Sequence, residues 1–128
     1  MKYYIEKVTD YSFEEAVQKV TDELKKEGFG VLTEINIHEK LKDKLNVDFR
    51  KYRILGACNP AAAYQALQAE DKIGTMLPCN VIVQETTDNK VEVAAVNPIA
   101  SMMAIENASL GGIATDIKER LERVIQAL

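Results

Sequence analysis

The sequence predicts a single domain of mixed helices and strands over residues 1–128. Of these residues 47% are hydrophobic and 28% are charged, the balance of a globular domain that is large enough to fold without a metal or a disulfide. Helical apolar repeats alternate with short β-branched runs, in the order β-α-β-α-β-α-β-β-α-α. The turn at Asp88-Asn89 marks the last two strands as a hairpin.

The individual elements follow from periodicity and from the residues that start and stop them. We expect strands over residues 3–8, 31–38, 50–58, 79–85 and 91–96, and helices over 12–27, 39–46, 59–70 and 97–104, with a final helix that carries an apolar stripe from Leu110 to Leu128. The strand over 31–38 alternates and is expected to bury one face.

Several short motifs support these boundaries. Ser12-Phe13-Glu14-Glu15 is a capping box that begins the first helix. Asn59-Pro60 and Asn97-Pro98 each place a cap before a proline at the first helical position. Gly56 inside a strand indicates a bulge or a close backbone approach. Gly111-Gly112 near the start of the last helix is costly, so we expect close packing there to compensate.

Charge and hydropathy exclude some functions. The net charge is −4, whereas a non-specific nucleic-acid binder carries a basic face. No apolar run approaches the roughly 18 residues of a membrane span. Near the start of the sequence, charged residues appear before any apolar run long enough for a signal peptide. We therefore expect a cytoplasmic protein that contacts neither nucleic acid nor membrane. In that compartment Cys58 and Cys79 are expected to be free thiols.

The segments around these cysteines resemble a known family. The phrases Gly56-Ala57-Cys58-Asn59-Pro60, Ala63-Tyr64-Gln65-Ala66-Leu67 and Gly74-Thr75-Met76-Leu77-Pro78-Cys79-Asn80-Val81-Ile82-Val83 resemble the domain-of-unknown-function family 302. The similarity continues through the hairpin, Asn97-Pro98 and the closing helix. Asn97 stands where the family often has Asp, which weakens any acid–base role there.

This resemblance implies an α+β fold similar to the TATA-binding-protein-like class. The expected fold is a mostly antiparallel sheet of about five strands, packed against two longer helices, with short additional helices. The resemblance also implies a homodimer, but it supplies no activity.

The cysteine pair is the strongest candidate for a site. Cys58 ends one strand and Cys79 begins a later one. Parallel strands would separate them by about 20 Å, whereas antiparallel strands would place both at one end of the sheet. The resemblance favours the antiparallel case. Each cysteine adjoins an asparagine, so the candidate ligand-binding residues are Cys58, Asn59, Cys79 and Asn80.

Several interpretations of these residues stay open. Cys58 and Cys79 could hold a soft ion such as Cu(I) or Zn(II), but a closed zinc site needs four ligands. His38 is the only histidine, so a second copy or an external ligand would complete the shell. A dithiol–disulfide couple would need a lowered thiol pKa, and amides at 61–63 could hold an anion. Both cysteines could instead be structural, since cysteine packs as a small hydrophobe.

Other residues give weaker signals. A capping or surface role suits His38 better than catalysis, and gap-filling suits Met102-Met103 better than soft ligation. A small basic group consists of Arg50, Lys51 and Arg53. Such a group is common on a solvated strand edge, where charge prevents aggregation, and the alternative is an anion site. No catalytic triad, paired carboxylates or dinucleotide fingerprint appears, which argues against an enzyme.

These observations favour a homodimeric binding module for a small ligand or a soft metal ion at Cys58 and Cys79, with no other cofactor. The alternatives are a thiol-based redox or sensor protein that uses the same cysteines, and a protein-interaction module in which they are structural.

Overall fold

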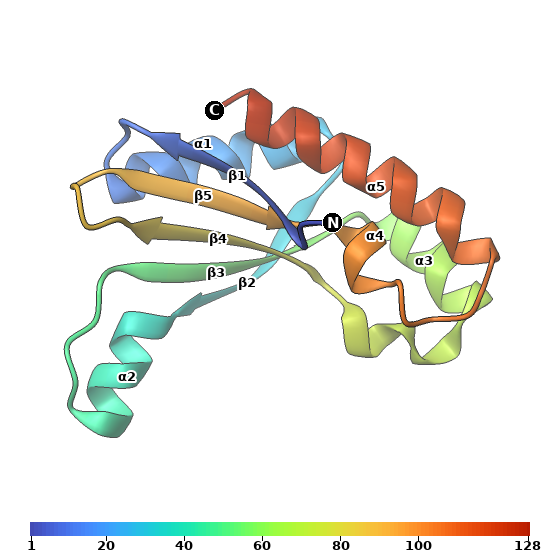
Figure 1. The fold of residues 1–128 in the computed structure, drawn as a ribbon, viewed down its shortest axis with the longest axis horizontal. Helices are drawn as coiled ribbons and strands as arrows, with labels where there is room; N and C mark the ends of the chain where they lie inside the picture. The colour runs from blue at the N-terminus through green and yellow to red at the C-terminus, as the bar shows by residue number, and fades with distance from the viewer.

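The computed structural model describes residues 1–128 as a five-stranded sheet with strand order β1-β5-β4-β3-β2. Every neighbouring pair of strands is antiparallel, and the two long helices α1 and α5 lie on the same side of the sheet (Figure 1). The predicted α+β fold is therefore confirmed. The strands are β1 (Tyr4–Thr9), β2 (Gly30–Asn36), β3 (Tyr52–Cys58), β4 (Cys79–Glu85) and β5 (Val91–Val96).

The helices follow the predicted order, with one addition. The segment between the third helix and β4, expected as a loop, forms a 3₁₀ helix, η1 (Asp71–Met76). None of the helices is long and apolar enough to cross a membrane. The α-helices are α1 (Phe13–Lys26), α2 (Ile37–Leu45), α3 (Pro60–Ala69), α4 (Pro98–Ser101) and α5 (Ser109–Gln126).

The core fills the space between the sheet and the helices α1 and α5. Alternate residues of the central strands point into it, and the helices supply one apolar stripe each, as a two-layer fold requires. The largest fully buried side chains of this cluster are Leu24, Leu55, Leu121, Val20, Val81, Val83, Val93 and Val124. The intervening residues of the same strands point to the opposite face of the sheet.

The capping box of α1 is present as predicted. The Glu15 amide donates to Ser12 Oγ at 3.2 Å, and the Ser12 amide donates to Glu15 Oε1 at 3.0 Å. Two donors that the first turn would otherwise leave unpaired are thereby satisfied, which fixes where α1 begins.

Gly56 marks a close approach, as the sequence indicated. A Cβ atom there would lie 2.3 Å from Thr33 Oγ1 and 2.9 Å from Pro78 Cγ. The register of β2 shifts between Val31 and Thr33, next to this contact. Only a residue without a side chain lets β2 and the segment before β4 come this close to β3.

Three details differ from the sequence predictions. The strand β2 buries none of its residues, because it forms one edge of the sheet. The helix α5 contacts β1 and β5, which lie toward the opposite edge. The prediction of close packing at Gly111 and Gly112 is wrong, since both residues are exposed and a Cβ atom on either would meet nothing within 4 Å.

Arg53 also differs from its predicted role on a charged strand edge, whereas Arg50 and Lys51 lie just before β3. The strand β3 lies inside the sheet, between β2 and β4. Arg53 is paired with Glu14 at 2.9 Å and donates to Asn36 Oδ1 at 2.6 Å. Arg53 therefore joins α1 to the sheet and is not free to hold an external anion.

Candidate functional site

The two cysteines lie at the same end of the sheet. The strands β3 and β4 are antiparallel, and Ala57 is the direct partner of Cys79. Cys58 is the next residue after Ala57, so it lies diagonally across from Cys79. The antiparallel arrangement that brings the cysteines to one end is confirmed, and both thiols are free.

A small cavity lies at this end of the sheet, where α3, α4 and α5 meet it. Its volume is about 30 Å³. Because one water needs roughly 10–15 Å³ on this measure, the cavity holds about two to three waters at most. Pockets for ordinary organic ligands are roughly ten times larger. Cys58, Asn59, Cys79 and Met102 line it together with Ala57, Ala62, Ala63, Ala66, Leu77, Pro78, Pro98, Ile113, Ala114 and Ile117.

Cys79 faces the helices and packs against the core. Burial raises the pKa of its thiol from the ordinary 9.0 to about 11, and the nearby Cys58 adds to this effect because two negative thiolates repel each other. Cys79 is therefore a neutral thiol at pH 7. A dithiol–disulfide couple needs the opposite shift, so the environment of Cys79 argues against the redox alternative.

Cys58 reaches the cavity from a different direction. It is the last residue of β3, pairs with Gly30 of β2 and is half-buried. Alternation along β3 puts Leu55 and Ala57 on the helix side and Cys58 on the other. Cys79 thus borders the cavity from the helix side of the sheet, and Cys58 borders it from the last position of β3, on the other side.

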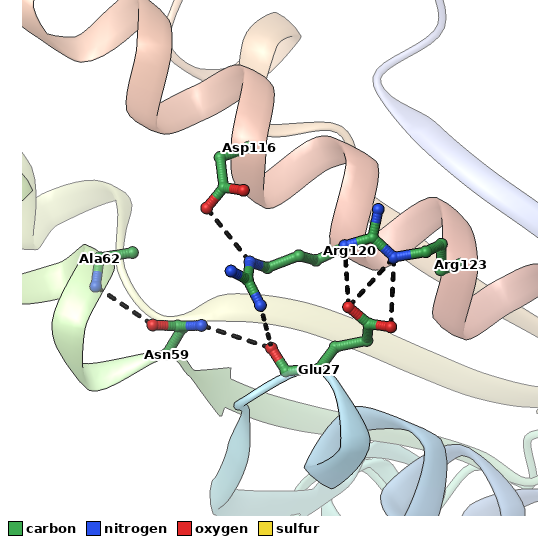
Figure 2. A network of polar contacts seen from close by, with 6 residues as sticks. All are labelled: Glu27, Asn59, Ala62, Asp116, Arg120 and Arg123. Carbon is green, nitrogen blue, oxygen red and sulfur yellow. Dashed lines mark hydrogen bonds and ion pairs between the residues drawn. The ribbon is translucent and has the colours of Figure 1, made fainter.

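Asn59 is held by a network that joins three helices (Figure 2). Its Oδ1 accepts from the Ala62 amide at 3.1 Å, and its Nδ2 donates to the Glu27 carbonyl at 3.5 Å. Arg120 Nη1 donates to the same carbonyl at 3.1 Å, and Arg123 pairs with the Glu27 carboxylate at 2.9 Å. The network anchors the start of α3, one wall of the cavity, to the end of α1 and to α5.

The same contacts bear on the proposed anion site at residues 61–63. The Ala62 amide is used by the Asn59 side chain, and the Ala63 amide donates to the Asn59 carbonyl at 2.9 Å. Only the amide of Ala61 is left over at this helix start, because Pro60 has none. The structure therefore does not support an anion site on these amides.

Two residues singled out in the sequence lie away from the cavity. Asn80 is exposed and lines a hollow on the opposite face of the sheet with Ile82 and Tyr4, because it alternates with Cys79 along β4. His38 lies in the first turn of α2, where its Nδ1 accepts from the Tyr52 amide at 3.0 Å. The structure thus places Cys58, Asn59 and Cys79 together and leaves Asn80 out.

Met102 packs against the small core cluster of Ala66, Ile73 and Leu110, as the sequence predicted, and it also borders the cavity. It lines the cavity after α4, whereas its neighbour Met103 is exposed. The only signal in the sequence was the pair of methionines following Asn97-Pro98. That signal could not distinguish the two, because which side chain turns inward depends on how α4 packs on α5.

Comparison with known proteins assigns the family. The model of a family described as "Domain of unknown function DUF302" matches residues 5–128. The chain belongs to this family. It is similar to a solved protein described as an uncharacterized conserved DUF302 protein from Bacillus stearothermophilus, with 27% identity, a TM-score of 0.92, and 99% of this chain and 98% of that chain covered. A search of curated proteins returned no match. The family assignment thus agrees with the resemblance and adds no activity.

Proposed function

We propose that this chain binds a soft metal ion, Cu(I), in the cavity at Cys58 and Cys79. The observation that carries the proposal is an almost wholly apolar cavity of about 30 Å³ with both cysteines in its wall. A space of this size suits a single ion or a ligand of a few atoms rather than an organic cofactor.

The donor atoms around the cavity favour copper(I) over zinc. The sulfur-containing residues of its lining are Cys58, Cys79 and Met102, and thiolate and thioether ligands are those that Cu(I) prefers. Nowhere in the chain do three or more His, Cys, Asp or Glu side chains gather at a possible metal site. A closed zinc site needs four such ligands, so zinc does not fit.

Binding at this site is coupled to proton release. A cysteine binds metal as a thiolate, and Cys79 is protonated at neutral pH because burial raises its pKa to about 11. Each thiol that forms a sulfur–copper bond therefore gives one proton to solvent. Two bound thiolates leave a Cu(I) centre with a charge of −1, and no oxidation is involved.

Competition with a coloured Cu(I) chelator under anaerobic conditions tests the proposal. We expect the wild-type protein to withdraw one equivalent of Cu(I), and Cys58→Ser and Cys79→Ser each to lower the affinity at least tenfold. Met102→Leu removes the thioether while keeping the apolar volume, and we expect it to weaken binding less. Met103→Leu is the matched control, because Met103 is 69% exposed and outside the cavity.

Two results would overturn the proposal. One is a wild-type protein that takes no Cu(I) from the chelator. The other is binding that both serine variants retain, since the ion would then lie elsewhere.

A further inference from the structure

The helix α3 separates the cavity at the two cysteines from solvent. One side of the helix lines the cavity through Ala62, Ala63 and Ala66. On its other side Tyr64 is 65% exposed and Leu67 is 44% exposed. A single helix therefore closes this part of the cavity, at the end of the molecule where α3 lies beside α5 (Figure 1).

Apolar burial holds α3 only weakly. Ala66 is the only buried residue of α3, whereas α5 buries six of its residues. Because alanine has a small side chain, its burial contributes little free energy. Elements with few buried apolar contacts are the ones that open locally while the rest of a domain stays folded. Of these two walls of the cavity, α3 is therefore the one that opens at lower cost.

Side-chain amides hold both ends of α3 to the rest of the chain. At the start of the helix, Asn59 Nδ2 donates to the Glu27 carbonyl at 3.5 Å. Arg120 of α5 donates to the same carbonyl and fixes its position (Figure 2). At the end of the helix, Asn107 Nδ2 donates to the Ala69 carbonyl at 2.8 Å. These two amides replace the apolar contacts that α3 lacks.

We propose that α3 is a lid over Cys79, which the side-chain amides of Asn59 and Asn107 hold closed. The space beneath the lid holds about two to three waters, so a larger molecule reaches the Cys79 sulfur only when α3 moves. A Cu(I) ion that arrives or leaves with other ligands attached exceeds this space. As the entrance of a copper site the lid rests on the proposed function, but its opening is measurable without any metal.

Both asparagines allow the hydrogen bond that holds the lid to be removed selectively. The Oδ1 atom of Asn59 accepts from the Ala62 amide at 3.1 Å, and that of Asn107 accepts from the Ser109 amide at 3.0 Å. An aspartate keeps an oxygen for each of these local contacts. It has no hydrogen to donate when ionised, so its charge would face a carbonyl oxygen. Asn59→Asp and Asn107→Asp should therefore release the lid and keep the local turns.

The reaction of Cys79 with a neutral dipyridyl disulfide tests the lid. Every protein in the series carries Cys58→Ser, so that Cys79 is the only thiol. Its reaction forms a mixed disulfide and releases one coloured thiopyridone. Without further changes, we expect labelling at least tenfold slower than in the urea-unfolded chain. At low urea its rate should hardly depend on urea, because the opening of one helix exposes little surface.

The aspartate variants are compared with a matched control. Asn59→Asp and Asn107→Asp should each raise the labelling rate tenfold or more without a steeper dependence on urea. Asn36→Asp makes the same chemical change at a side chain that bonds to Arg53 and Glu39 rather than to α3, and it should leave the rate unchanged. The two variants act at opposite ends of α3, so either one alone tests the lid if the other does not fold.

Three results would overturn the inference. Labelling as fast as in the unfolded chain would mean that nothing covers Cys79. Labelling with the full urea dependence of global unfolding would mean that α3 does not open by itself. Rates that both aspartate variants share with the control would mean that the two amides do not hold the helix.

The lid and the copper site can fail separately. A protein that takes no Cu(I) from the chelator, but labels as expected, would remove the proposed function and leave a lid over a thiol. A protein that binds Cu(I), but whose aspartate variants label at the control rate, would do the reverse. If both hold, Asn107→Asp should also release Cu(I) to the chelator at least tenfold faster. An unchanged release rate would mean that the lid is not the entrance of the copper site.

Discussion

Replacing Cys79 with valine should remove a specific loss of stability at high pH. Burial raises the pKa of the Cys79 thiol from 9.0 to about 11. Between these values the unfolded chain loses the thiol proton while the folded chain keeps it. Stability therefore falls by about 1.4 kcal/mol for each pH unit across this window, and is fully present below pH 9.0.

The size of the effect follows from the width of the window. The interval from 9.0 to about 11 corresponds to a loss of at most roughly 3 kcal/mol by pH 11. Cys58 and Cys79 are the only residues with ionisable side chains that line the cavity. Valine keeps an apolar side chain of similar size in the strand, so its own effect on stability does not depend on pH.

Urea unfolding of both proteins between pH 7 and pH 11, with a phosphine reductant present, measures this difference. Lysines and tyrosines titrate in the same range, but they are common to both proteins and cancel in the comparison. We expect the stability of wild type relative to Cys79→Val to decline steadily from pH 9 upward. Two curves that stay parallel to pH 11 would refute the conclusion that Cys79 is desolvated.

Three further changes test other parts of the structure. Gly56→Ala should lower the free energy of unfolding by about 1–3 kcal/mol, because its Cβ would lie 2.3 Å from Thr33 Oγ1 and 2.9 Å from Pro78 Cγ. Gly30→Ala is the control, since a Cβ there meets nothing within 4 Å. It should change the free energy measured by thermal or urea unfolding by less than about 0.5 kcal/mol. Asn59→Ala removes a helix cap and should cost about 1 kcal/mol by the same assay; an unchanged midpoint would mean that the cap is not formed in solution. Arg123→Met should raise the pKa of Glu27 toward its ordinary value, since the Arg123 hydrogen bond is what chiefly lowers it; an NMR titration of Glu27 that is the same in both proteins would contradict this.

The elements with strong local signals were predictable from sequence. The capping box at Ser12, the asparagine caps before Pro60 and Pro98, and the alternation of β4 and β5 each specify a boundary by themselves. In these cases the residues that decide the structure are adjacent in the chain. Local chemistry and tertiary packing then agree, as expected for a foldable sequence.

The errors lie where tertiary context decides. The alternation of β2 is real, but burial depends on whether a helix covers that end of the sheet, and β2 is the outermost strand. From the sequence, Arg53 could be taken for a residue of an edge strand. No residue near it in the chain indicates that β2 pairs with β3 on its outer side. Such misassignments follow from reading periodicity without knowing the order of strands in space.

The candidate site was only partly predictable for the same reason. The sequence shows that Cys58 and Cys79 flank strand ends, and the antiparallel pairing then brings them together. It also suggests Asn80 by its position next to Cys79, although alternation sends that side chain to the other face. Met102 enters through the packing of α4 and α5, which has no local signature.

X-ray absorption at the copper edge reports directly which atoms bind the ion. For protein loaded anaerobically with one equivalent of Cu(I), we predict a first shell made only of sulfur, which loses one scatterer in Cys79→Ser and is unchanged in Met103→Leu. A shell of nitrogen or oxygen, or a sulfur shell that the loss of Cys79 leaves intact, would contradict a copper site in the cavity between β3, β4 and the helices.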